Sequence, residues 1–293
     1  MDDRKSMKQS ELIQIDLDKV LESKMGSKVR YVPRFLVNWL KRTICQDELN
    51  GMLQRFYPNT GAEFSRVALR DLEIKVDLKN PEKLPSYDSR RVIFVSNHPL
   101  GGLDGIALIA LISDAYQTAE QKANDEQCLR FVVNDLLMAV EPLGNVFLPI
   151  NKHGKQSREA IEDINKAFEG DDPVLVFPAG LVSRMGKGGE IRDLEWHKMF
   201  VAKAAQFHRD VVPLYFSGEN SQHFYKFARW RKRLGLKFNI EMIYLPQELV
   251  KAKGSEYEVT VGERIPWERF AKAGDQLALA QEIKEITYSM KTK

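Results

Sequence analysis

A histidine and an aspartate that follow an apolar run are the residues of this sequence best suited to chemistry. The segment VSNHPLGGLDG, residues 95–105, places His98 and Asp104 on either side of Gly101 and Gly102. Because glycine permits a loop to fold back, the carboxylate can reach one imidazole nitrogen. The other nitrogen is then a general base for a substrate hydroxyl, which contributes roughly 10²- to 10⁴-fold in rate. The alternative is that Asp104 only caps a helix and His98 is an ordinary loop residue.

The elements that must position this pair are those of an α/β protein. From residue 91 onward, short β-branched runs alternate with helical patterns, which is typical of a largely parallel central sheet covered by helices. VSNHPLGGLDG is a strand-to-helix junction, where open α/β sheets gather their sites. Asp104 precedes the apolar run of that helix and is expected to be its N-cap. The predicted strands are RVIFVS, RFVVN, NVFLPI, PVLVF, VVPLYF, FNIEMIYL and YEVTV, the last two close enough to pair antiparallel, and the predicted helices cover residues 104–116, 154–169 and 195–208.

The N-terminal part of the chain has helical periodicity instead. In VPRFLVNWLKRTI, apolar residues recur at three- and four-residue spacing, which predicts an amphipathic helix that either docks on the core or lies on lipid. Helical periodicity gives way to strands near residue 70. We therefore predict a helical, membrane-associating segment over residues 1–70 and a catalytic α/β domain over residues 71–293.

Composition and local patterns exclude several classes of protein. Lys and Arg outnumber Asp and Glu by only 44 to 41, so a basic surface must come from clustering. Cys45 and Cys128 stand in no metal-binding pattern, which favours a reducing compartment, and no histidine spacing predicts a metal site. The N-terminus lacks the features of a signal peptide, and the most apolar stretch, Gly105–Ser113, is less than half of the ~20 residues that a transmembrane helix needs. We expect any membrane contact to be peripheral.

Two familiar catalytic motifs do not match. In GLVSRMGKGGE, five residues separate Gly180 from Gly186, and Gly188 follows Lys187 where a P-loop needs Ser or Thr for magnesium. The sequence has no GxSxG elbow. It therefore indicates neither a P-loop enzyme nor an ordinary serine hydrolase.

Three further segments follow the histidine segment in a recognisable order. They are GNVFLPINK at 144–152, VLVFPAGLVSR at 174–184 and VVPLYFSG at 211–218. With VSNHPLGGLDG, they resemble the four blocks of the glycerolipid acyltransferase family, which includes the lysophosphatidic acid acyltransferases. The resemblance covers about residues 70–270, and the ordered set is far more specific than any one block.

The first and third blocks depart from the commonest family pattern. Five residues separate His98 from Asp104 where four are usual, and Ala179 stands where the third block usually has glutamate. Val182 takes the place of the arginine associated with the acceptor's phosphate, and Arg184 lies two residues later. These forms look more like the branch that includes ornithine-lipid O-acyltransferases and hemolysin-like proteins. The departures bear on the acceptor and leave the expected chemistry unchanged.

The resemblance implies an O-acyltransferase, in the class that transfers acyl groups other than aminoacyl groups. His98 would deprotonate the hydroxyl of a lysolipid, either a lyso-aminolipid or lysophosphatidic acid, and Asp104 would orient His98. The hydroxyl would attack the thioester of an acyl carrier protein or coenzyme A, with no metal or further cofactor. A catalytically silent lipid-binding relative is the alternative. The residues expected to bind substrate are Asn97, Gly101, Gly102, Asn151, Lys152, Phe177, Pro178, Ala179, Gly180, Ser183, Arg184 and Lys198, although the cations among them can also be read as solvated surface charge.

A basic, aromatic stretch offers a way to meet a membrane. HFYKFARWRKRLGLK, residues 223–237, has six Lys and Arg residues, no acid and four aromatic rings other than histidine. As a helix it suits an anionic interface on the cytoplasmic face of the cell membrane. Packing of the rings on the sheet is the alternative, and no nucleic-acid module surrounds the stretch. The predicted membrane-interface residues are Trp39, Phe224, Tyr225, Arg229, Trp230, Arg231, Lys232 and Arg233.

Overall fold

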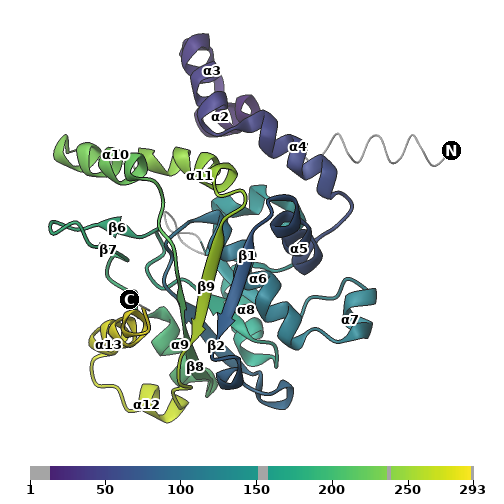
Figure 1. Ribbon diagram of the computed structural model, residues 1–293, viewed down its shortest axis with the longest axis vertical. Coiled ribbons are helices and arrows are strands. Elements are labelled where there is room, and N and C mark those ends of the chain that lie inside the picture. The colour runs from purple at the N-terminus through teal and green to yellow at the C-terminus, as the bar shows by residue number, and fades with distance from the viewer. Residues whose placement is uncertain (1–13, 151–157, 236–238, 292–293) are drawn as a thin grey trace.

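A central sheet organises the protein, and the computed structural model describes residues 14–150, 158–235 and 239–291 (Figure 1). Within these ranges the sheet has seven strands in the order β1-β9-β8-β2-β5-β3-β4. Neighbouring strands are parallel except β8 and β9, which are antiparallel. The predicted fold class is confirmed. The strands are β1 (Lys75–Lys79), β2 (Val92–Ser96), β3 (Arg130–Asn134), β4 (Phe147–Ile150), β5 (Val174–Val176), β8 (Asp210–Phe216) and β9 (Glu256–Val261), with a separate ribbon of β6 (Arg184–Met185) and β7 (Ile191–Arg192).

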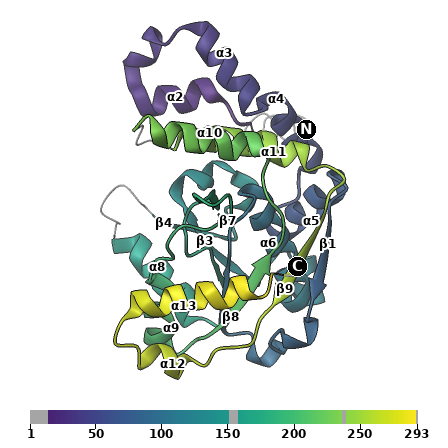
Figure 2. The same cartoon turned by 60° about the vertical axis from the view of Figure 1, so that its left-hand side comes forward.

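Helices cover both faces of the sheet (Figure 2). Those that precede it are α2 (Leu17–Met25), η1 (Gly26–Tyr31), α3 (Arg34–Thr43), α4 (Gln46–Phe56) and α5 (Gly61–Asp71). Between β1 and β5 lie η2 (Pro81–Lys83), η3 (Tyr87–Ser89), α6 (Gly102–Tyr116), α7 (Ala119–Ala123), η4 (Asp135–Ala139), η5 (Glu141–Leu143) and α8 (Arg158–Glu169). After β7 come α9 (Met199–Phe207), α10 (Gln222–Arg233), η6 (Ile240–Tyr244), α11 (Leu245–Lys251), α12 (Trp267–Ala271) and α13 (Gln276–Ser289).

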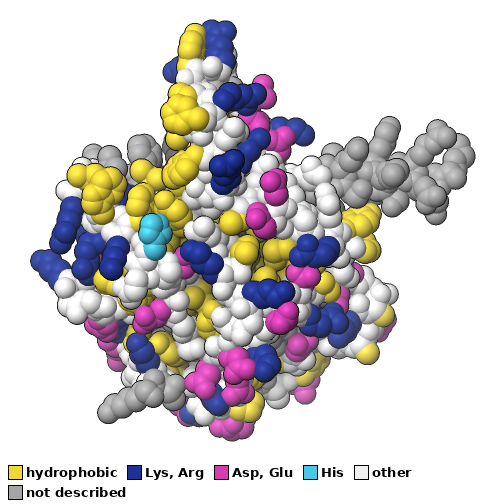
Figure 3. Space-filling model, turned by 45° about the horizontal axis from the view of Figure 1, so that its top comes forward, with side chains coloured by type: hydrophobic (Ala, Val, Ile, Leu, Met, Phe, Trp, Pro, Cys, Tyr) yellow, Lys and Arg dark blue, Asp and Glu magenta, His cyan; other side chains and the backbone are white. Residues whose placement is uncertain are grey.

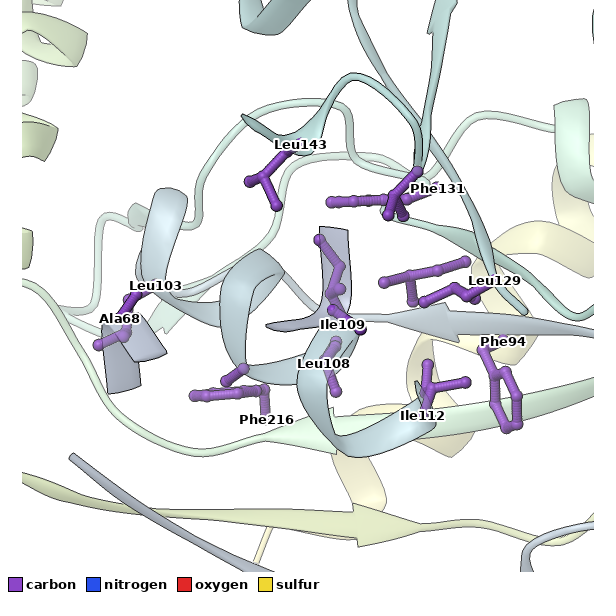
Figure 4. Packing of buried hydrophobic residues seen from close by; sticks show 14 of the residues in the cluster. Ala68, Phe94, Leu103, Leu108, Ile109, Ile112, Leu129, Phe131, Leu143 and Phe216 are labelled. Atoms are coloured by element: carbon purple, nitrogen blue, oxygen red, sulfur yellow. The ribbon is translucent and has the colours of Figure 1, made fainter. Parts of the chain in front are cut away.

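The central strands β2, β5 and β8 are buried on both faces, as a parallel sheet requires. In β2, Val92 and Phe94 join the core formed with α4, α5 and α6, whereas Ile93 and Val95 join the core formed with α8, α9 and α13. Figure 4 shows the first of these cores, where the apolar side chains of α6 lie against the sheet. Burial of each Ile, Val or Phe side chain stabilises the fold by roughly 1.5–3 kcal/mol. This two-sided core fixes β2, and with it the loop that carries His98.

Two sequence predictions about strands need correction. The described part of FNIEMIYL forms η6 and the start of α11 instead of a strand, because Glu241 is fully buried between two arginines and Pro246 lies in the first turn of α11. YEVTV does form β9, but its antiparallel partner is β8. β1 was not predicted, since its sequence KVDLK is charged, and this strand lies at the edge of the sheet with its residues exposed or half-buried.

The helices at the N-terminus divide between core and periphery. Met52, Phe56 and Ala68, from α4 and α5, join the same core as α6. By contrast, α2 and α3 project beyond the sheet on the side of α10 (Figures 1 and 2). The domain boundary near residue 70 stays a prediction. Among the described helices, none is both long and apolar enough to cross a membrane.

Candidate active site

Three neighbouring strands bring the sequence blocks together at one edge of the sheet. β2 lies between β5 and β8 and runs parallel to both, so the carboxyl ends of all three strands face the same edge. Register pairs Val95 with Val176 and Ser96 with Leu214. The segments that follow these strands are those of the first, third and fourth blocks. The topology therefore assembles residues that lie more than a hundred positions apart.

The predicted pair His98 and Asp104 is in direct contact. Asp104 Oδ2 lies 3.0 Å from His98 Nδ1, and the Asp104 side chain is completely buried. The same oxygen accepts the N–H of Leu100 at 2.9 Å and of Gly101 at 3.3 Å, while Oδ1 accepts the N–H of Gly105 at 2.9 Å. With both oxygens held by the backbone, the carboxylate has one orientation, and that orientation selects the tautomer with hydrogen on Nδ1.

The two glycines between the pair have different roles. Gly101 has φ +87°, and a Cβ there would lie 2.9 Å from Leu245 Cδ1. Gly102 is exposed, and a Cβ there would meet nothing within 4 Å. α6 begins at Gly102 with Gly101 as its N-cap, so Asp104 is the third helical residue and reaches back to the Gly101 N–H. The predicted N-cap position of Asp104 is therefore wrong by three residues.

An aromatic ring fixes the plane of the imidazole. Phe177 stacks on His98 with ring centroids 4.1 Å apart and an interplanar angle of 16°. Phe131 contacts Phe177 edge-on at 5.3 Å. The His98 side chain is 16% exposed, and its Nε2 forms no hydrogen bond within the described part of the chain. Nε2 is thus positioned to exchange a proton with a bound substrate.

Residues of the third block form hydrogen bonds that hold the loop of His98 in place. Gly180, with φ +59°, donates its N–H to Phe177 O at 2.9 Å and closes the turn of FPAG. Ser183 donates its N–H to His98 O at 2.7 Å. Pro178, Ala179 and Ser183 are buried in this turn. Among the residues predicted to bind substrate, these three therefore pack within the protein.

Asn97 holds the sheet together. Its side-chain amide donates to Phe216 O at 2.8 Å and accepts the Phe216 N–H at 2.7 Å, and the residue is 2% exposed. The amide thus continues the β2–β8 pairing one residue beyond the strand. The structure thus gives Asn97 a role in strand pairing, and its predicted contact with substrate stays a prediction.

Arg184 is likewise engaged inside the protein. Its guanidinium donates to Val182 O at 2.6 Å and to Glu241 Oε1 at 2.7 Å, and Arg231 Nε lies 2.7 Å from the other oxygen of Glu241. Burial lowers the pKa of Arg184, and the Glu241 carboxylate opposes that shift. Both arginines thus bind Glu241, and the predicted contacts of Arg184 with substrate and of Arg231 with the membrane stay predictions. Lys198, by contrast, is exposed at the start of α9.

The predicted membrane residues of α10 divide between its two sides. Phe224 and Tyr225 are 0% and 1% exposed and pack with Val182, so their predicted membrane position is wrong. Trp230 is 55% exposed, and Lys232 and Arg233 are exposed beside it. Arg229 is half-buried and donates to Gly186 O at 2.7 Å. On α3, Trp39 is 44% exposed. Figure 3 shows hydrophobic side chains next to Lys and Arg on these projecting helices.

The sequence did not identify two buried acids near the site. Glu241 lies among apolar residues that resemble a strand, and Asp193 lies in the charged run EIRDLEW, which resembles solvated surface. Both are buried, at 0% and 5% exposure. Asn151 and Lys152 lie outside the described residues. No cluster of three or more potential metal ligands occurs in residues 14–150, 158–235 and 239–291.

Comparisons with known proteins give the family of the chain. Residues 19–293 match the model of a family described as Acyltransferase. The chain is 42% identical over 276 residues to lyso-glycine lipid O-acyltransferase of Phocaeicola vulgatus, which covers 94% of this chain and 95% of the relative. It is 40% identical over 284 residues to lyso-glycine lipid O-acyltransferase of Bacteroides thetaiotaomicron, covering 97% and 100%. The crystal structure of the 1-acyl-sn-glycerophosphate (LPA) acyltransferase PlsC from Thermotoga maritima aligns over 89% of this chain and 98% of that one, with 16% identity and a TM-score of 0.42.

Proposed function

Because the chain belongs to the acyltransferase family, we propose that it transfers a fatty acyl group from a thioester to the hydroxyl of a lysolipid, with lyso-glycine lipid as the acceptor. Both curated relatives carry that acceptor in their names, at 42% and 40% identity over nearly the whole chain. The departures of the first and third blocks from the commonest pattern also favour a lyso-aminolipid over lysophosphatidic acid. The observation that carries the chemistry is the 3.0 Å contact between His98 Nδ1 and Asp104 Oδ2.

The proposed reaction begins with proton transfer to His98. Nε2 accepts the proton of the acceptor hydroxyl as its oxygen forms a bond to the thioester carbonyl carbon. Asp104 accepts the hydrogen bond from Nδ1 and stabilises the imidazolium that results. The tetrahedral intermediate then collapses, the carbon–sulfur bond breaks, and the departing thiolate takes the proton from Nε2. The products are the acylated lipid and a free thiol, and His98 returns to its starting state.

The proposed donor is an acyl carrier protein or coenzyme A thioester, used as a co-substrate. Acyl transfer from a thioester to a hydroxyl involves no oxidation or reduction and no net uptake or release of protons. A histidine and an oriented carboxylate therefore provide the proton transfers that the reaction needs. We accordingly propose that no metal or further cofactor takes part.

The proposed lipid acceptor also indicates that the protein works at a membrane surface. We propose peripheral attachment to the cytoplasmic face of the cell membrane through α3 and α10. The exposed rings of Phe35, Trp39 and Trp230 are 75%, 44% and 55% accessible. Lys232 and Arg233 lie beside Trp230, and each basic residue near an anionic surface adds about 1 kcal/mol to binding. This arrangement supports a membrane-associating role for the N-terminal helical segment.

The test is acyl transfer by the purified protein. Labelled acyl thioesters of acyl carrier protein and of coenzyme A are each offered with lyso-glycine lipid, lyso-ornithine lipid and lysophosphatidic acid. We expect the wild type to acylate lyso-glycine lipid with the highest kcat/KM, and His98→Ala to abolish transfer while circular dichroism and liposome binding stay unchanged. Equal activity of wild type and His98→Ala would refute the mechanism. Preference for lysophosphatidic acid would refute the acceptor.

A further inference from the structure

A second buried carboxylate, Asp193, contacts the backbone of His98. Asp193 follows β7 and is 5% exposed. Its Oδ1 accepts the His98 N–H at 3.2 Å and the Ser183 hydroxyl at 2.6 Å, and its Oδ2 accepts the Trp196 indole N–H at 2.8 Å. One carboxylate therefore joins the first block, the third block and the segment that leads into α9.

These bonds hold His98 at both of its backbone polar groups. Asp193 binds the His98 N–H, and the Ser183 N–H binds His98 O at 2.7 Å. Ser183 in turn depends on Asp193, because its hydroxyl donates to Oδ1. Asp104 and Phe177 fix the orientation of the His98 ring, whereas the backbone of His98 fixes the point at which the side chain begins. The position of Nε2 therefore depends on Asp193 as well as on Asp104.

The C-terminal helix α13 holds Asp193 in place. The Asp193 N–H donates to the Tyr288 hydroxyl at 2.7 Å, and Lys284 Nζ donates to Asp193 O at 2.8 Å. Gln281 exchanges two hydrogen bonds with the backbone of Trp196, at 3.1 and 2.7 Å. Burial lowers the pKa of Lys284, and the Asp193 carboxylate opposes that shift. Residues of α13 thus hold the backbone of Asp193 in place, and the Asp193 side chain extends from there to the loop that carries His98.

We propose that Asp193 is a positioning residue for acyl transfer, which holds His98 Nε2 in line with the acceptor hydroxyl and ties the HPLGGLD loop to the FPAG turn. The inference rests on the proposed role of His98 as general base. Displacement of a reacting group by about 1 Å is enough to cost about 100-fold in rate.

The test compares Asp193→Asn with a matched control. Asn keeps the size of the side chain but removes the charge and one acceptor. We expect kcat to fall 10- to 100-fold, with KM for both substrates changed less than 3-fold. In Trp196→Phe, the indole bond to Asp193 is lost and the buried core is perturbed, but the contact to His98 remains. That control therefore reports what loss of stability and of the indole bond does to activity while Asp193 still contacts His98.

The split between kcat and KM separates positioning from a general structural role. Loss of folded protein lowers the apparent kcat only in proportion to the folded fraction. We therefore expect kcat per folded molecule to fall in Asp193→Asn more than in Trp196→Phe, with KM close to the wild-type value in both variants.

Two outcomes would overturn the inference. One is a loss of kcat/KM in Asp193→Asn that comes from a raised KM with kcat unchanged, and the other is equal kcat in the two variants at equal folded fraction, measured by circular dichroism. If His98→Ala is inactive in the same assay, either outcome refutes the role of Asp193 and leaves the proposed function standing. Full activity of His98→Ala would instead refute the proposed function together with this inference.

Discussion

Substitution of the two adjacent glycines by alanine should have opposite effects on stability. Gly101 has φ +87°, and an added Cβ would lie 2.9 and 3.1 Å from the two methyl groups of Leu245. A non-glycine residue at such a φ costs of order 1–3 kcal/mol. At Gly102, the first residue of α6, an added Cβ would meet nothing within 4 Å. Alanine there is a better helix former than glycine and should leave stability unchanged or raise it by up to about 1 kcal/mol.

The assay is thermal or urea unfolding of Gly101→Ala and Gly102→Ala next to the wild type. A loss of 1–3 kcal/mol in a protein of this size lowers Tm by roughly 2–6 °C. Acyl transfer by Gly101→Ala should also fall, because the Gly101 N–H binds Asp104 Oδ2 and the strained loop would displace that carboxylate. Equal stability of the two variants would refute the reasoning, since it would show that the positive φ of Gly101 is not required.

Three further changes have expected outcomes. Asp104→Asn should lower kcat by about 10²- to 10⁴-fold, because an amide cannot stabilise the imidazolium, and a smaller loss in steady-state assays would contradict the dyad. Glu241→Leu leaves two buried guanidinium groups without their carboxylate and should cost about 3–5 kcal/mol in urea unfolding, so an unchanged midpoint would count against that buried ion cluster. Phe224→Ala, fully buried, should destabilise the fold by about 3–5 kcal/mol, whereas Trp230→Ala, 55% exposed, should weaken sedimentation with anionic liposomes and leave stability unchanged; the reverse pattern would refute the assignment of the two sides of α10.

The parts of the fold that sequence predicts well are those with a strong local signal. β2, β5 and β8 are apolar runs buried on both faces, and such runs have few other stable arrangements. β1 lacks this signal because it is a charged edge strand. The run before α11 has the apolar alternation of a strand, yet Glu241 in its middle is paired with arginines from two other elements. Tertiary contacts decided the structure of that run.

The candidate site divides in the same way. The spacing of His98 and Asp104 indicated their contact, because the loop between them is short and contains glycine. The N-cap was misplaced because Gly101 takes that position and Asp104 caps from the third residue. Asp193 could not be identified, since its bonds to His98 and Tyr288 each span 95 residues. The local sequence around Asp193 is typical of a charged surface loop, and it is the packing of α13 that makes Asp193 a buried residue.

The contacts by which α13 holds Asp193 have a consequence for the synthesis of the protein on the ribosome. Proteins are made from the N-terminus, and segments fold as they emerge. His98, Asp104 and the FPAG turn leave the ribosome long before Lys284 and Tyr288, which hold Asp193 by its backbone. A nascent chain that ends before α13 therefore carries His98 and Asp104 without the helix that holds Asp193 in place. If Asp193 positions His98 as proposed, acyl transfer should reach its full rate only when α13 has been released and has docked.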